Sequence, residues 1–538
     1  MTEQTHKKNV LILNVAEIAY YFYFAVMAFA KGIGLYDGMW PYTAALILGA
    51  VFIIAKLALT EHTLAEWIFI LGMLGLGMLV YHNSGEKGIL IYIAMIVAMK
   101  KVPVRRLFSI GLVIWGSTFV IQTILTLTGV KPDIFVIHAK LGLGYIIRWS
   151  LGYPHPNVLQ ITFMILCAFI LYLTNLKGKK LVYATLLMLS GNLYVFFYSV
   201  SYTGLIVAVV YLFGNLYLSF RKELTKTEKA LATLIFPACA AFSVLGPVVF
   251  PERLWEICNK VLNTRFNIAR TYLTTDPITL FGARPSDAIP EGLQNIDSSY
   301  VFALMHYGAV VFLLLCVGYM ALIHHCMKEK KYKELSIIIG LAIAAIAEPF
   351  FVNPSFKNIS LLFLGAFIFE VFEKFAENKP EHFLNRKLIL CSAGKREVML
   401  PVEKPVRMKE SYIQVILEKK RVIAVAAAGI AIIAGTVFAV TADMPECYYA
   451  VHSSTQIWGG EIYFDINNLP EDFEGKILNY TDPETPMQKV EGNIVTVEYV
   501  RGIVSSGLWC GIFGAVFISI FLYVRGKNEY MMEKDRKL

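Results

Sequence analysis

Pro251–Tyr300 reads PERLWEICNKVLNTRFNIARTYLTTDPITLFGARPSDAIPEGLQNIDSSY and is a polar interruption in a chain that is otherwise mostly apolar. A guanidinium group is planar and always charged, and it holds phosphate or carboxylate oxygens through two parallel hydrogen bonds. The segment is therefore a candidate anion-binding site, unless its arginines pair with the acids of the same segment. Its basic residues are four arginines and one lysine: Arg253, Lys260, Arg265, Arg270 and Arg284.

On both sides of this segment, the composition is that of a polytopic membrane protein. The chain has 538 residues, of which 57% are hydrophobic and 17% charged, and its mean hydropathy is +0.58. Such a chain is too apolar for a soluble domain. We predict an all-α fold with about fourteen transmembrane helices. The predicted spans are Val10–Ala30, Tyr42–Leu59, Leu64–Tyr81, Gly88–Met99, Leu107–Thr128, Val158–Thr174, Leu181–Ser199, Thr203–Ser219, Ala230–Phe250, Tyr300–His324, Leu335–Phe351, Ile359–Phe375, Val422–Thr441 and Ile503–Val524.

Lysine-rich loops alternate with lysine-poor loops along the chain. Because positive residues collect on the cytoplasmic side, we expect a multi-pass protein of the cytoplasmic membrane with both termini in the cytoplasm. The net charge of +9 then reflects topology, and no nucleic-acid partner is expected. The first apolar run is expected to be a retained helix, not a signal peptide. The lysine-rich loops are KKVPVRR (100–106), NLKGKK (175–180), FRKELTKTEK (220–229) and HHCMKEKKYK (324–333).

The spans and loops divide the chain into three parts. Residues 1–376 form the predicted transmembrane domain, with extracytoplasmic loops at 129–157 and 251–299. Residues 377–420 are rich in Lys, Glu and Pro and are expected to be a solvated cytoplasmic linker. Residues 421–538 hold two spans around a small extracytoplasmic β module, 443–502. A strand pattern indicates this module, because EIYFDI (461–466) and NIVTVEYV (493–500) alternate apolar and polar residues.

Metal and disulfide signals do not stand out in the sequence. The eight cysteines lie mostly within or beside apolar spans and show neither a disulfide framework nor a metal-ligand spacing. The outer segments lack an obvious carboxylate cluster such as DxD. We therefore expect no cofactor and no metal.

Five short pieces of sequence carry a family resemblance. They are RWSLGYPHPN (148–157), TRF (264–266), LFG (280–282), DSSY (297–300) with the glycine of HYG (306–308), and EPFFVNPSFKN (348–358). With the layout of the spans from Val10 to Phe375, these pieces resemble the bacterial O-antigen and capsular polysaccharide polymerases, which belong with the O-antigen ligases. The chain departs from the family in YSVSYTG (198–204), where Tyr202 stands in place of an arginine. No phosphate contact is therefore expected from that loop.

The resemblance implies a glycosyltransferase on the outer face of the cytoplasmic membrane. Its expected partners are undecaprenyl-pyrophosphate-linked oligosaccharides, which it would polymerise, together with membrane lipids, a flippase and a chain-length regulator. Three alternatives stay open. One is a ligase that delivers the glycan to another acceptor, the second is a flippase for the same lipid-linked unit, and the third is a scaffolding membrane protein.

The chemistry of this reaction selects the candidate residues. Negative charge develops on the departing pyrophosphate oxygen and needs a cation beside it. A general base must take the proton of the attacking hydroxyl, and the candidates are His155, Asp297 and His306. The predicted catalytic residues are Arg265, His155 and Asp297, and the predicted substrate-binding residues are Arg148, Arg270, Arg284, His306, Asn157 and Tyr300.

Each of these assignments has a structural alternative. His155 lies between two prolines and would brace its loop, whereas Asp297 would cap the helix that follows it. His306 would be a polar contact in the core of a span. On a helix, Arg265 and Arg270 diverge by about 140° and would serve different groups.

Two further expectations concern the arrangement of these parts. Arg148 and Arg265 are expected to face one shared opening, because a cavity lined by one sign of charge concentrates an anionic ligand. The two C-terminal spans and the β module resemble a chain-length regulator, so we expect them to regulate the product or guide the glycan; the alternative is a simple appended domain.

Overall fold

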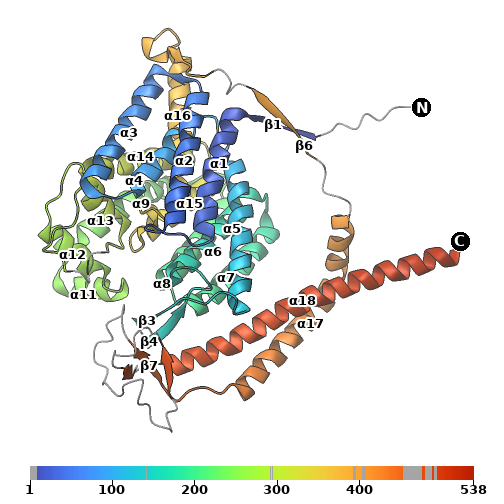
Figure 1. Cartoon of the computed structure of the whole chain (residues 1–538). Coiled ribbons are helices and arrows are strands. Elements are labelled where there is room, and N and C mark those ends of the chain that lie inside the picture. The colour runs from blue at the N-terminus through green and yellow to red at the C-terminus, as the bar shows by residue number, and fades with distance from the viewer. Residues whose placement is uncertain are drawn as a thin grey trace, which may run out of the picture. The chain divides into compact units, whose positions relative to one another are not determined.

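The computed structural model describes residues 9–140, 142–290, 293, 295–391, 396–402, 408–451, 475–478, 487–489 and 493–537. These residues are mostly helical and form two compact units. The larger unit comprises residues Ile12–Phe135 and Trp149–Met399. The smaller unit comprises the described residues within Met1–Leu11, Val136–Arg148 and Leu400–Leu538. Figure 1 labels most of the helices and some of the strands of both units.

The larger unit is a bundle of helices (Figure 1). Capping boxes fix the starts of two of them, at Thr63 with Glu66 and at Thr225 with Glu228. The helices are α1 (Val15–Gly32), α2 (Trp40–Leu59), α3 (Leu64–Ser84), α4 (Gly88–Val97), α5 (Val104–Leu127), α6 (Pro156–Leu173), α7 (Gly178–Ser199), α8 (Tyr202–Phe220), α9 (Lys226–Val244), α10 (Gly246–Val249), α11 (Glu252–Val261), α12 (Arg265–Thr275), α13 (Ser299–Phe302), the π-helix η2 (Ala303–Tyr307), α14 (Gly308–Lys328), α15 (Tyr332–Ala344), the 3-10 helix η3 (Pro349–Phe351), α16 (Ser360–Asn378) and the 3-10 helix η4 (Phe383–Asn385).

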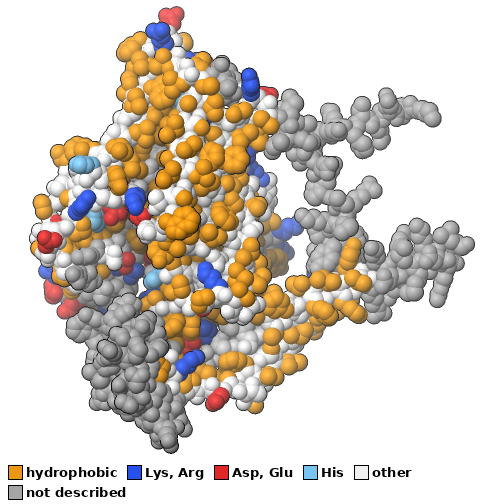
Figure 2. Space-filling model, in the orientation of Figure 1, with side chains coloured by type: hydrophobic (Ala, Val, Ile, Leu, Met, Phe, Trp, Pro, Cys, Tyr) orange, Lys and Arg blue, Asp and Glu red, His pale blue; other side chains and the backbone are white. Residues whose placement is uncertain are grey.

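The prediction of a helical membrane protein is confirmed. Within the described ranges, 10 helices are long and apolar enough to cross a membrane. The other predicted spans coincide with α1 and α16, which carry charged residues, and with α4 and α15, which have 10 and 13 residues. The precise number of spans therefore stays a prediction. Figure 2 shows hydrophobic side chains covering the face formed by the bundle helices, as a surface against lipid requires.

One predicted boundary is wrong at the N-terminus. The first span was expected from Val10, but Asn9–Asn14 form a strand, β1, that pairs with β6 (Glu397–Val402). The run NVLILN satisfies its backbone groups in a ladder with a distant strand. Hydropathy alone could not distinguish this arrangement from the first turns of α1.

The predicted linker also contains short strands. β5 (Lys387–Leu388) pairs antiparallel with β2 (His62–Thr63), directly before α3. The amide of Leu64 donates to the Arg386 carbonyl oxygen at 3.0 Å, which extends this pairing to the first residue of α3. Part of segment 377–420 is thus docked on the bundle.

In the smaller unit, two long helices pack along each other. α17 (Met408–Thr441) and α18 (Ile494–Lys537) approach closely through small residues. A Cβ atom at Gly507 would lie 2.9 Å from the Ala431 carbonyl oxygen, so only glycine permits this approach. The unit also contains part of the ribbon formed by β3 (Phe135–Lys140) and β4 (Gly144–Trp149).

The predicted β module, 443–502, stays a prediction, although short strands lie within it. Three short strands form one sheet in the order β8 (Lys476–Leu478), β7 (Tyr448–Val451), β9 (Met487–Lys489). The expected strand at 461–466 lies outside the described residues. The expected strand at 493–500 is wrong, because α18 begins at Ile494. In this helix the Tyr499 hydroxyl donates to the Ala439 carbonyl oxygen of α17 at 2.8 Å, and this packing outweighs the local strand pattern.

Reporter fusions test the predicted topology. We expect fusions at Thr225 and Lys404 to lie in the cytoplasm and one at Gln294 to lie outside, because lysine-rich loops are retained on the cytoplasmic side. A cytoplasmic fusion at Gln294 would contradict this topology. It would also place loop 251–299 in the cytoplasm, whereas the expected reaction takes place on the outer face of the membrane.

Candidate functional site

Arg265 is the centre of a buried polar cluster in the larger unit. It is the first residue of α12, and its side chain is 9% exposed. Its Nε donates to the Ala347 carbonyl oxygen at 2.5 Å, and its Nη1 donates to that of Leu262 at 3.0 Å. Its Nη2 lies 3.2 Å from Asp297 Oδ2 and 3.7 Å from Glu348 Oε1. The guanidinium group thus joins two segments to the start of α12.

Glu348 is the buried acid of the cluster. It lies between α15 and η3, where Pro349 prevents the helix from continuing, and its side chain is 2% exposed. The Asn157 side-chain amide donates to its Oε1 at 3.1 Å. The Ser299 hydroxyl donates to the Glu348 backbone oxygen at 2.6 Å. The break between α15 and η3 therefore connects loop 129–157 to the start of α13.

Asp297 differs from Glu348 in its exposure. Its side chain is 39% exposed, although it pairs with the buried Arg265. The N-cap of α13 is Ser298, so the expected capping position falls one residue after Asp297. Asp297 is therefore the carboxylate of the cluster that a molecule arriving from solvent can reach.

His155 is the N-cap residue of α6. Its Nδ1 accepts from the Asn157 backbone N–H at 3.1 Å, and its carbonyl oxygen accepts from Val158. A neutral ring that accepts at Nδ1 carries its proton on Nε2 and can donate there. His155 therefore braces the start of α6, which is the structural alternative that its two neighbouring prolines suggested.

The loop in front of His155 is held by buried polar contacts. Asp133 Oδ1 accepts from the Gly152 amide at 3.1 Å and from the Ser150 hydroxyl at 3.4 Å. Burial raises the pKa of the Asp133 carboxyl above its ordinary value. The Lys131 amine donates to the Gly152 carbonyl oxygen at 2.5 Å. These contacts fix the path of the chain into α6.

Two of the motif glycines meet each other. Gly282 and Gly308 have φ angles of 77° and 85°, in the region that favours glycine. The amide of Ala283 donates to Met305, and that of Ala309 donates to Thr279. A Cβ atom on either glycine would overlap the opposite backbone. The LFG and HYG pieces therefore form one contact that fixes loop 251–299 on η2.

The structure unites some of the predicted residues and separates others. Asn157, Arg265 and Asp297 are joined through the cluster with Glu348. Arg270 lies on the same helix as Arg265 but pairs with Glu252 at 3.5 Å. That contact is the pairing within the loop that was the alternative to an anion site. Arg265 and Arg270 therefore contact different carboxylates.

Other predicted residues have contacts of their own. The Tyr300 hydroxyl donates to the Ala342 carbonyl oxygen at 2.8 Å. His306 is buried in η2 against Tyr272 and Phe302. Arg284 is exposed. Arg148 is buried in the smaller unit, so its expected opposition to Arg265 stays a prediction.

Lys357 is a buried cation that the sequence prediction missed. Its side chain lies over the Phe350 ring, 4.3 Å from the centroid, and its amine is 3.5 Å from the Val158 carbonyl oxygen. Burial lowers the pKa of this amine to about 7. The signal was present, because Lys357 belongs to the same EPFFVNPSFKN piece as Glu348.

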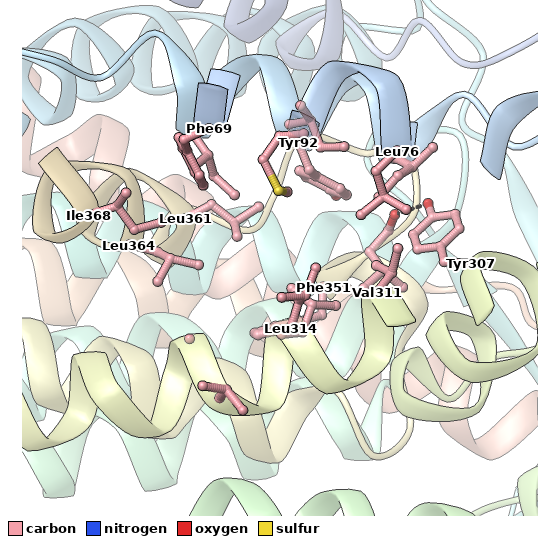
Figure 3. A pocket seen from close by; sticks show the side chains of 18 residues that line it. Phe69, Leu76, Tyr92, Tyr307, Val311, Leu314, Phe351, Leu361, Leu364 and Ile368 are labelled. Carbon is pink, nitrogen blue, oxygen red and sulfur yellow. Dashed lines mark hydrogen bonds between the residues drawn. The ribbon is translucent and has the colours of Figure 1, made fainter. Parts of the chain in front are cut away.

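A separate apolar cavity of about 240 Å³ lies among α3, α4, α14 and α16 (Figure 3). Phe69, Leu76 and Leu364 are among its lining residues. The Tyr307 hydroxyl at its edge donates to the Val352 carbonyl oxygen at 2.5 Å. Among the described residues, its lining is apolar apart from the tyrosine hydroxyls, which does not suit an anion.

Within the part of the chain that the structure describes, no group of three or more His, Cys, Asp or Glu side chains is placed to hold a metal ion. Comparison with protein-family models, with curated proteins and with solved structures finds no match to this chain.

Proposed function

We propose that this chain is a membrane glycosyltransferase that polymerises undecaprenyl-pyrophosphate-linked oligosaccharides on the outer face of the cytoplasmic membrane. The observation that carries the proposal is the convergence of three motif pieces on one buried polar cluster. Asn157, Arg265 and Glu348 come from distant parts of the chain and meet within hydrogen-bonding or ion-pair distance. Buried charge is costly, and its concentration beside membrane spans favours a functional site over a scaffold.

Arg265 is the proposed group that stabilises the departing pyrophosphate. Two of its contacts are to backbone carbonyl oxygens, which orient the guanidinium group. Its Nη2 faces the partly exposed Asp297. A phosphate oxygen that arrives beside Nη2 would replace this carboxylate with an equally charged ligand. Charge that develops on the leaving oxygen would then meet a donor that is already positioned.

Asp297 is the proposed general base. Once displaced from Arg265, its carboxylate would be available to take the proton of the attacking sugar hydroxyl. Glu348 is less suited to this role, because it is buried and accepts a hydrogen bond from Asn157. His155 accepts from the backbone at Nδ1, so its Nε2 is better suited to donate a hydrogen bond than to remove a proton.

Removal of the gene tests the proposal against its alternatives. Loss of a polymerase should shorten the cell-surface glycan to a single repeat. Loss of a ligase should instead leave long glycan on the lipid carrier, and loss of a flippase should leave single lipid-linked units on the cytoplasmic face. A glycan of unchanged length would contradict all three enzymatic and transport assignments.

Truncation after Lys404 tests the role of the C-terminal part. We expect sugar transfer to persist and the product length to change, because Asn157, Arg265, Asp297 and Glu348 all belong to the larger unit. The measurement is the length distribution of the glycan made by equal amounts of full-length and truncated protein. Complete loss of transfer would contradict this expectation and would indicate that the ribbon carrying Arg148 needs α17 and α18.

A further inference from the structure

α11 has three distinct faces. The first face contacts α12. The Asn259 side-chain oxygen accepts from the Asn267 amide at 2.9 Å, and the Arg270 guanidinium group lies 5.1 Å from the centroid of the Trp255 ring. These contacts hold α11 against the helix that begins with Arg265. They also determine which way its other faces point.

The second face is apolar and exposed. Leu254, Ile257 and Val261 fall within about 60° of one another on a helix. They are 44%, 54% and 61% exposed. Single apolar residues on a surface are ordinary, but three on one face of a ten-residue helix form a stripe. A helix with such a stripe is amphipathic, and its apolar side packs against another apolar surface.

The stripe continues an apolar surface that begins on a membrane-length helix. α9 is one of the helices long and apolar enough to cross a membrane, and its Leu234 is exposed. Val248 and Val249 of α10, which follow it, are also exposed, and only Phe250 and Pro251 separate α10 from α11. Exposed apolar residues thus follow one another along the chain from α9 through α10 to α11, with the exposed Glu252 and Arg253 at the start of α11.

The third face is polar and charged. Arg253 and Lys260 are seven residues apart and share one flank of the helix beside the apolar stripe. Long basic side chains in this position extend toward lipid phosphates while their stems cover apolar surface. Glu256 lies farther from the stripe, where water is expected.

We propose that α11 lies in the headgroup layer of the bilayer, with Leu254, Ile257 and Val261 among the lipid acyl chains. Its partner is the phospholipid surface around α9. This inference goes beyond the proposed reaction and does not depend on it. One consequence concerns Arg265, whose Nη1 donates to the carbonyl oxygen of Leu262 at the end of α11. Anchoring α11 sets the depth of this arginine at the level of lipid phosphates.

Fluorescence quenching in lipid vesicles tests the proposal. An environment-sensitive fluorescent amino acid replaces Ile257 in the full-length protein and, in a second variant, the adjacent Glu256. The protein is reconstituted into phosphatidylcholine vesicles with or without brominated acyl chains. We expect bromolipid to quench the label at 257 several-fold more strongly than the label at 256, and iodide in the water to show the reverse order.

Two further labels make the outcome decisive. A label at Val317 of α14, which is 65% exposed on a membrane-length helix, gives the bromolipid quenching of a lipid-facing position. A label at Val261 repeats the test one turn farther along α11. Equal quenching by iodide at 256 and 257 would overturn the proposal. Protection of 257 and 261 from both quenchers would also overturn it, because it would show that protein covers the stripe.

Discussion

Arg265→Lys is expected to slow sugar transfer by about a hundredfold while leaving the amount of protein in the membrane near normal. Lysine keeps the positive charge beside Glu348 but loses the fork that reaches Ala347, Leu262 and Asp297 together. Removing one preorganised donor to a developing oxyanion typically costs about 3 kcal/mol in the barrier. The measurement is the rate of polymer formation per amount of membrane protein.

Arg265→Ala is expected to be worse in a second respect. It leaves the buried Glu348 without its arginine, and an uncompensated buried charge costs about 3–5 kcal/mol of stability. Both transfer and protein amount should therefore fall. The matched control is Arg221→Ala, which removes an arginine paired with Glu228 at 2.6 Å in loop 220–229. Full polymer from a normally expressed Arg265→Ala protein would remove this residue from the site.

Asp297→Asn is expected to lower transfer by about 10²–10⁴-fold, because the amide has the size of the carboxylate but cannot take a proton. Protein amount and melting temperature should stay near those of the unaltered protein, since Asp297 is partly exposed. Glu348→Gln, in contrast, should lower the melting temperature, because it removes a buried counter-charge of Arg265.

His155→Asn distinguishes the two candidate bases. Asparagine is a good N-cap residue and keeps an acceptor for the start of α6, but it has no ring nitrogen to take a proton. If this variant loses as much transfer as Asp297→Asn while remaining stable, the base is His155, and the assignment to Asp297 is wrong. Transfer and melting temperature measured on the same preparations separate these outcomes.

The sequence predicted the positions of the helices better than it predicted which elements pack against one another. Long apolar runs such as Leu64–Tyr81 have one solution in lipid, so hydropathy is sufficient to place them. The strand prediction for NIVTVEYV (493–500) was wrong because the alternating pattern is short. The helix α18 is instead stabilised by packing on α17, which no local pattern contains. Strand and helix periods cannot be separated over so few residues.

For the site as well, local patterns identified individual residues but not the contacts between distant residues. The motif pieces indicated Arg265, Asp297 and Asn157, and all three are in the cluster. The central role of Glu348 came from contacts between distant residues. Arg265 and Ala347, for example, are 82 positions apart. Arg270 and Glu252 both lie within loop 251–299, and their pairing was expected as the alternative to an anion site. What could not be predicted was which arginine pairs locally and which reaches across the fold.

An assay in detergent tests the central claim most directly. The purified full-length protein is mixed with a fluorescent oligosaccharide linked to undecaprenyl pyrophosphate, and the products are separated by size. Detergent removes the two compartments that a transporter needs, but it leaves an enzyme able to act. We predict a ladder of products with two or more repeats, greatly slowed in Arg265→Lys and Asp297→Asn. Unchanged single-repeat substrate in detergent, with movement of the same lipid across vesicles that contain the protein, would contradict the account.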